Sequence, residues 1–190
     1  MRTTIDDIIH TVETSLRTSF SNTYVWFGKD DNLLFYKPTN GTWSIAEILE
    51  HVSLTNHFLL LIINKTTAKA IKRSLNADAV TVPDNYMEML RRVDEVGKHK
   101  SFTWIRPEHM EPVGKNLNEV RVLLDAQLER CIANLHSLSN GEGLLVHTTM
   151  TVNDLGKIDV YQYLYFLAKH IDRHITQMQI VETEFEKNKR

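Results

Sequence analysis

Apolar residues recur at helical spacing along four long stretches of the chain, and the clearest stretch lies near the C-terminus. At about 100° per residue, one arc of a helix over 160–181 collects a largely apolar set of side chains. Its members are Tyr163, Phe166, Leu167, His170, His174, Gln177, Met178 and Val181. Asp159 and Gln162 predict the N-cap of this helix, and the charged tail 182–190 is expected to fray. Both histidines on the arc are therefore expected to point into the core.

Three further stretches have the same periodicity and predict the other long helices. Residues 4–20 carry isoleucine, valine, leucine and phenylalanine on one face. Ser44 and Glu47 match a capping box, which predicts a helix from there to about residue 76. Another helix is predicted over 117–139. Four capped amphipathic helices, with no convincing series of strands, predict an all-α protein that forms a four-helix bundle with long connecting loops.

The connections between these helices are long for a compact domain. Residues 22–43 are rich in aromatic side chains and are expected to cover one end of the bundle. Residues 77–115 are the least regular part, with a short helix predicted over 84–96 and Trp104 as a candidate pocket wall. Residues 144–152 have a β-like composition, which leaves two interpretations open, a short strand or an extended lid.

A third histidine points inward from an apolar face, because His51 shares one side of its helix with Leu54 and Phe58. Glu47 lies one turn before His51. It is either a metal ligand or only the closing residue of the capping box, and we favour the capping box. Five other histidines are interpreted as surface or loop residues outside the site, with an approach of His147 from its loop as the weaker alternative. They are His10, His57, His99, His109 and His147.

Two histidines one turn apart suit joint coordination of a divalent metal, because their Cβ atoms lie about 5–6 Å apart on a helix. His170 and His174 have this spacing, and His51 on a facing helix supplies a third imidazole. Three protein ligands leave a coordination position open, which is typical of catalytic rather than structural zinc. The alternative is a plain bundle with polar core histidines. That alternative needs a buried hydrogen-bond partner for each imidazole, and few polar residues share these faces.

Composition narrows the class of protein. The chain has 190 residues, 42% of them hydrophobic and 24% charged, which is ordinary for one soluble globular domain over 1–190. A formal net charge of -2 argues against nucleic-acid binding, which relies on a concentrated basic surface. The single cysteine, Cys131, falls on an apolar helix face. Because the N-terminus lacks the order of a signal peptide and the longest apolar run, over 58–63, is too short to span a bilayer, we expect a cytoplasmic protein without a membrane partner.

Two segments of the chain carry a family resemblance. Trp43-Ser-Ile-Ala-Glu-Ile-Leu-Glu-His51 and His170-Ile-Asp-Arg-His174-Ile-Thr-Gln177 are similar in order and spacing to the motifs of the DinB/YfiT-like superfamily. The resemblance covers most of the chain. It implies an up-down-down-up style four-helix bundle that holds a divalent metal, usually nickel or zinc. By this resemblance the metal ligands are His51, His170 and His174.

The resemblance also implies hypotheses about function. Some relatives are thiol-dependent enzymes of S-transfer or isomerisation. The first hypothesis is therefore a metal-dependent S-transferase that uses a low-molecular-weight thiol against small electrophiles, because metal coordination lowers the pKa of a thiol and creates the nucleophile. Two alternatives stay open. One is a hydrolase that uses metal-bound hydroxide at the same site, and the other is a non-catalytic metal-binding bundle that acts as a sensor, store or interaction protein.

Four further residues bear on the site and on assembly. Arg173 lies off the histidine face and is interpreted as a solvated or salt-bridged surface residue, with a place at the pocket rim as the alternative. Gln177 continues the histidine face by one turn and either orients a ligand or fills a polar niche in the core. Tyr161 and Tyr165 fall off the inner face, so a homodimer interface and packing against a loop are both open interpretations.

Overall fold

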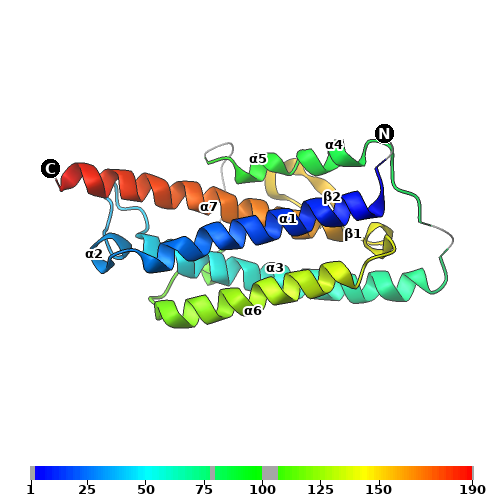
Figure 1. The fold of residues 1–190 in the computed structure, drawn as a ribbon, viewed down its shortest axis with the longest axis horizontal. Coiled ribbons are helices and arrows are strands. Elements are labelled where there is room, and N and C mark those ends of the chain that lie inside the picture. Colours follow the sequence, from blue (N-terminus) through cyan, green and yellow to red (C-terminus); the bar gives the residue numbers. More distant parts are fainter. Residues whose placement is uncertain (1–2, 78–79, 100–106, 190) are drawn as a thin grey trace.

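Four long helices form the body of the computed structural model, which describes residues 3–77, 80–99 and 107–189. They are α1 (Ile5–Tyr24), α3 (Ile45–Ser74), α6 (Leu117–His136) and α7 (Val160–Asn188). α1 and α7 run in one direction, and α3 and α6 run in the other (Figure 1). α1 and α3 each pack against both α6 and α7. This arrangement is an up-down-down-up bundle, so the predicted all-α fold is confirmed.

Reciprocal caps start three of these helices where the sequence predicts them. The side chain of the N-cap residue accepts a hydrogen bond from a backbone N–H three residues on, and the side chain of that residue bonds back. The pairs are Thr4–Asp7, Ser44–Glu47 and Asp159–Gln162. Each cap satisfies backbone donors that have no partner inside the helix. These local contacts explain why the helix starts are readable from short segments of sequence.

The charged tail was expected to fray, but α7 stays helical to Asn188. The connection between α1 and α3 holds this end of the helix. Phe185 packs edge-on against the ring of Tyr36, with 5.3 Å between the ring centroids. The Glu184 carboxylate accepts hydrogen bonds from the backbone N–H and the hydroxyl of Thr39, at 2.8 and 2.9 Å. As expected, the connection covers the end of the bundle where the C-terminus lies (Figure 1). It contains η1 (Val25–Gly28) and α2 (Asp31–Leu34).

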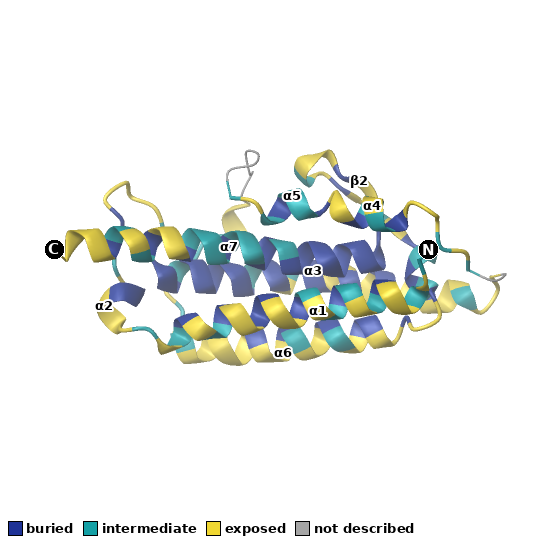
Figure 2. Cartoon of the chain, turned by 45° about the horizontal axis from the view of Figure 1, so that its top comes forward, coloured by how far each residue is buried: buried dark blue, intermediate teal, exposed yellow. Residues whose placement is uncertain are grey.

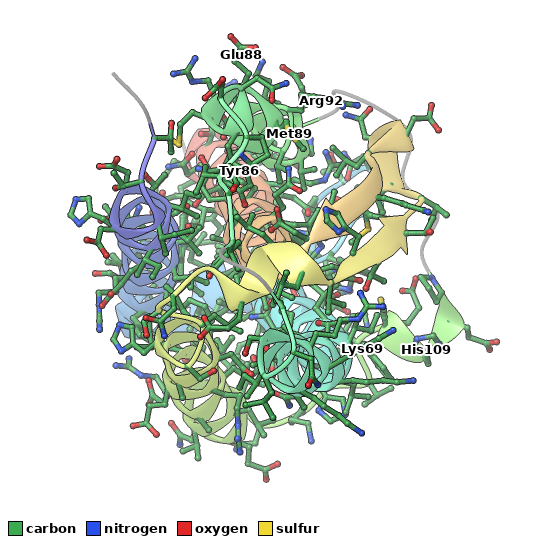
Figure 3. The ribbon with its side chains drawn as sticks, turned by 90° about the vertical axis from the view of Figure 1, so that its right-hand side faces the viewer. Lys69, Tyr86, Glu88, Met89, Arg92 and His109 are labelled. Atoms are coloured by element: carbon green, nitrogen blue, oxygen red, sulfur yellow. The ribbon has the colours of Figure 1, made fainter. Side chains whose placement is uncertain are left out.

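A long crossover leads from α3 to α6 along one side of the bundle (Figure 2). Its helical pieces are α4 (Tyr86–Arg91), α5 (Asp94–Gly97) and η2 (Glu108–Met110). The single short helix predicted over 84–96 is therefore two pieces, and α5 packs on α7. Tyr86 is fully buried and points into the molecule, whereas Glu88 and Arg92 point away from it (Figure 3). Trp104, the candidate pocket wall, lies outside the described residues.

The segment before α7 forms a small antiparallel hairpin. The register of its strands runs from His147 opposite Asp159 to Met150 opposite Gly156. Asn153 in the turn has a φ of 49°, in the left-handed region that asparagine tolerates better than most residues. The structure therefore supports the short-strand interpretation of this segment. Its elements are η3 (Glu142–Leu145), β1 (His147–Met150), η4 (Val152–Asp154) and β2 (Gly156–Asp159).

The first half of α7 is buried on every side, and residues 160–168 are all buried (Figure 2). Tyr161 and Tyr165 are 0% and 8% exposed, so of the two open interpretations the structure supports packing against connecting segments. The Tyr161 hydroxyl donates to the carbonyl of Leu138, just beyond α6. The Tyr165 hydroxyl donates to the carboxylate of Asp94 on α5, at 2.7 Å. These covering segments are distant in sequence, and the two tyrosines give no support to a dimer face.

α3 is long and apolar enough to cross a membrane by length and composition, and no other helix among the described residues meets that test. Its most apolar window has a mean hydropathy of 1.3. This window is longer than the uninterrupted apolar run found in the sequence, because scattered polar residues lie within it. In this protein 61% of the window is buried inside the bundle. Such burial is typical of the core helix of a soluble protein, which passes the same test.

Candidate metal centre

Three histidines from two facing helices lie together in the core. His51 is in the second turn of α3, and His170 and His174 are near the middle of α7. The three residues are 3%, 2% and 6% exposed. The ring centroids of His170 and His174 are 4.5 Å apart, and those of His51 and His174 are 4.8 Å apart. One nitrogen of each ring lies within 4.8 Å of the others, so this cluster can bind a metal ion.

Hydrogen bonds to oxygen acceptors orient the rings of His51 and His174. Nδ1 of His51 is 2.8 Å from the carbonyl oxygen of Met110, and Nδ1 of His174 is 2.9 Å from Oε1 of Gln177. Both oxygens only accept, so each Nδ1 carries the proton and each Nε2 keeps its lone pair. Backing by a carbonyl or amide oxygen is typical of histidines that bind metals through the opposite nitrogen. Gln177 is therefore placed to orient His174, which is one of the two interpretations of this residue.

The spacing of the donor atoms fits a transition metal. Nε2 of His170 and Nε2 of His174 are 3.1 Å apart. Two imidazole nitrogens on one tetrahedral zinc, with bonds of about 2.0–2.1 Å, lie about 3.3 Å from each other. The donor atoms of all three rings lie within 4.8 Å of one another, so movements of at most about 1.5 Å would bring them to this spacing. Three neutral nitrogen donors are a ligand set that zinc and nickel both accept.

Burial keeps the imidazoles of His170 and His174 neutral. It lowers the pKa of His170 and of His174 well below the usual histidine value, because a charged ring loses its hydration there. The neighbouring histidines and Arg173 lower both pKa values further, since positive charges repel. A metal needs the neutral ring, so the two α7 histidines are in the metal-binding state at neutral pH.

A cavity of about 160 Å³ opens beside the three rings. Arg173 lines it and is half-buried, with Nη1 donating to the carbonyl of Lys98 at 3.0 Å, so the favoured prediction of a solvated surface arginine is wrong. The prediction of a solvated His99 is wrong for the same reason, since the crossover brings it to the cavity wall. Trp43 forms another wall, with its ring centroid 4.6 Å from that of His51. The lining residues are Trp43, His51, His99, His170, Arg173, His174 and Gln177.

Glu50 supports the site and was missed by the sequence analysis. It is 1% exposed, and its carboxylate accepts hydrogen bonds from three successive backbone N–H groups, at 2.9 to 3.0 Å. These bonds form a clasp that fixes residues 113–115, which follow η2 by three residues, and η2 ends at Met110, whose carbonyl orients His51. No sequence pattern links Glu50 to partners more than sixty positions away, and the only signal is a second glutamate, between Leu49 and His51, on a largely apolar helix. The three donors belong to Val113, Gly114 and Lys115.

Other candidate residues stay outside the cavity. Glu47 closes its capping box and accepts two bonds from Nζ of Lys37, at 2.5 and 2.6 Å, and it does not line the cavity. Cys131 is fully buried, and burial raises the pKa of its thiol to about 12, so it behaves as a small core residue. The remaining predicted surface histidines are exposed, and Figure 3 shows His109 at the edge of the molecule. They are His10, His57, His109 and His147.

The arrangement defines a class: an up-down-down-up helical bundle with a histidine cluster and a cavity between α3 and α7. The chain belongs to the DinB superfamily, whose family model matches residues 16–178. The chain is also similar to the uncharacterized protein YuaE of Bacillus subtilis (strain 168), with 26% identity over 161 residues, or 84% of this chain and 90% of that protein. No solved structure matches this chain. Family membership and the buried cluster together are compatible with metal binding.

Proposed function

We propose that this protein is a metal-dependent enzyme that binds one zinc or nickel ion through His51, His170 and His174 and joins a low-molecular-weight thiol to a small electrophile. The observation that supports an enzyme most directly is the cavity of about 160 Å³ beside the three nitrogen donors. A purely structural or storage site needs no space next to the metal, because protein ligands close its coordination sphere. Three protein ligands and an adjoining cavity leave a position for a substrate.

Different residues of the chain have different roles in such a site. When bound, a divalent metal lowers the pKa of a thiol and so supplies a nucleophile at neutral pH. Three neutral imidazoles leave the full charge of the ion to act on that thiol. Met110 and Gln177 hold two of the rings through their Nδ1 atoms. The Trp43 ring covers His51 and limits the access of water.

The composition of the cavity wall favours thiol chemistry over hydrolysis. Hydrolytic zinc sites commonly place a carboxylate beside the metal as a general base, as in the glutamate of the HExxH motif. Among the described residues that line this cavity there is no aspartate or glutamate. A thiol bound as thiolate needs no base once its proton has gone to solvent. The S-transferase hypothesis is therefore preferred to the hydrolase.

Elemental analysis tests the metal site directly. Purified wild type is compared with the double variant His51→Ala, His170→Ala and with His57→Ala, which removes an exposed histidine from the same helix. We expect about one equivalent of zinc or nickel in wild type and in His57→Ala, as in catalytic sites with three protein ligands, and none in the double variant. Circular dichroism shows whether the double variant is folded. Wild type that takes up no metal after reconstitution contradicts the proposal.

A second measurement tests the thiol. Cobalt(II) replaces the native metal, and 2-mercaptoethanol is titrated in while the near-ultraviolet spectrum is recorded. A saturable sulfur-to-cobalt charge-transfer band, absent from the double variant, is expected for a thiolate at the metal. Cobalt-loaded protein that shows no such band with any thiol, yet hydrolyses an activated ester, would favour the hydrolase instead.

A further inference from the structure

Arg173 is placed to act on whatever ligand enters the cavity. It lies between His170 and His174 in the sequence, and its side chain lines the same cavity as both rings. The bond from Nη1 to the carbonyl of Lys98, at 3.0 Å, ties the guanidinium to the crossover and restricts its position. A guanidinium is a planar fork of five N–H donors, a shape that matches the two oxygens of a carboxylate.

The charge of the cavity wall also favours an anion. The described lining residues are four histidines, a tryptophan, a glutamine and Arg173, so arginine is the only one with a fixed charge. Arg173 is half-buried, so water screens its charge only in part. A divalent ion on three neutral imidazoles adds two more positive charges. An anionic ligand offsets these charges, and in a partly enclosed cavity the attraction is stronger than in water.

We propose that the small molecule bound beside the metal carries a carboxylate, which the Arg173 guanidinium binds while a second group of the same molecule occupies the open metal position. This inference rests on the proposed metal centre and identifies the class of its ligand. With a thiol as the metal-binding group, the ligand is a mercapto-acid. Lysine at position 173 would keep the charge but lose the two-point geometry.

The size of the cavity places the two groups close together in the ligand. Pockets for drug-sized ligands measure about 300–1,000 Å³, whereas this cavity measures about 160 Å³. The part of the ligand between the metal and Arg173 is accordingly a few atoms long. Mercaptoacetate, with one carbon between its thiol and its carboxylate, is a suitable probe, and 2-mercaptoethanol is its neutral counterpart.

Thiol titration of the cobalt(II)-loaded protein tests the inference. The charge-transfer band gives the dissociation constant of each thiol for wild type, Arg173→Met, Arg173→Lys and the control Arg121→Met, whose arginine stacks on Tyr24 away from the cavity. Wild type and Arg121→Met are expected to bind mercaptoacetate at least about tenfold more tightly than 2-mercaptoethanol, as a charge-assisted hydrogen bond predicts. Arg173→Met should lose this preference, and Arg173→Lys should keep part of it.

The outcomes separate this inference from the proposed function. Failure of wild type to bind cobalt refutes the metal centre itself. Cobalt binding with an equal preference in wild type and Arg173→Met overturns the inference alone, because the preference then comes from chelation by the metal. If neither mercaptoacetate nor 2-mercaptoethanol binds to the cobalt-loaded protein, the inference is also overturned. Inorganic phosphate that displaces mercaptoacetate at lower concentration, and only when Arg173 is present, would show that Arg173 binds a phosphate rather than a carboxylate.

Two controls accompany the titration. The metal content after dialysis shows whether the thiol has removed the metal, and Arg173→Lys replaces Arg173→Met if the latter is unfolded.

Discussion

Two buried polar clusters lie along α7, and they differ in where their polar atoms point. The cluster at the start of the helix joins Asp159, Gln162 and Tyr86, which are 2%, 3% and 0% exposed. The cluster in the middle contains the three histidines, which are as deeply buried. The first joins its members to helix caps by hydrogen bonds, whereas the second brings nitrogens of three rings together beside a cavity. Burial alone therefore does not separate a functional cluster from a structural one.

The first cluster is explained by folding. The Tyr86 hydroxyl donates to Oδ1 of Asp159 at 3.0 Å, and the same oxygen accepts the backbone N–H of Gln162 at 2.9 Å. These bonds cap α7 and attach α4 to it, so they account for the burial of these polar side chains by their part in the fold. In the second cluster, Nδ1 of His51 and Nδ1 of His174 have such partners, and Nε2 of His170 lies 3.1 Å from Nε2 of His174, close enough to donate its proton to it. A metal ion at this place would take the position of that proton and accept the lone pairs of both rings.

The largest expected effect of this difference is on stabilisation by metal. Zinc at about one hundred times its dissociation constant should raise the free energy of unfolding of wild type by about 2.7 kcal/mol, because it binds only the folded state. Tyr86→Phe should lower the stability of the protein but leave this increment unchanged. His174→Ala should lose it. Thermal unfolding with and without zinc measures both, and an increment that survives in His174→Ala would place the metal elsewhere.

The next effect is a pH dependence confined to the first cluster. Burial raises the pKa of Asp159 to about 6, above the ordinary value of about 3.9 for the unfolded chain. The folded state thus prefers the protonated acid, and the contribution of this group to stability falls as pH rises from about 4 to 6. Asp159→Asn removes the titration and keeps a good N-cap. Between pH 4 and pH 7, the free energy of unfolding of this variant should rise by about 2 kcal/mol relative to that of wild type. Urea unfolding at the two pH values measures the gain, and a constant difference would show that Asp159 is ionised throughout.

The two clusters also differ in how far they could be read from the sequence. The caps and the His170–His174 pair were predictable because their partners lie within four residues of each other. The positions of Arg173 and His99 were not, since α5 and the residues next to it come to lie against α7 only in the folded protein. The interpretation of Tyr165 stayed open for the same reason, as its cover, α5, is some seventy residues away. Sequence thus predicts the donor atoms of the centre better than the wall around them.

A smaller effect tests the clasp that connects Glu50 to the site. Glu50→Gln replaces one acceptor oxygen by an N–H₂ group, so the segment over 113–115 loses part of its anchor. The Met110 carbonyl then orients His51 less firmly, and zinc affinity should fall about 20-fold, in the range known for groups that hold metal ligands. The control is Glu119→Gln, an exposed carboxylate that pairs with Lys115 in the same region at 3.8 Å. Competition with a chromophoric chelator gives the affinities, and equal values for both variants would show that Glu50 acts on the fold alone.

The smallest effect concerns Gln177. Its variants test whether this side chain orients the His174 ring or only fills space in the core. Gln177→Leu keeps most of the volume but removes the oxygen that accepts from Nδ1 of His174. Without that bond the ring is free to change tautomer or rotate, so zinc affinity should fall about tenfold. Gln179→Leu, on the exposed side of α7, is the matched control and should change nothing. Glutamate at 177 should restore the affinity, because a carboxylate accepts the same hydrogen bond and strengthens the ring as a donor to the metal. A loss in Gln177→Leu that Gln177→Glu does not recover would mean that the amide serves packing rather than the orientation of His174.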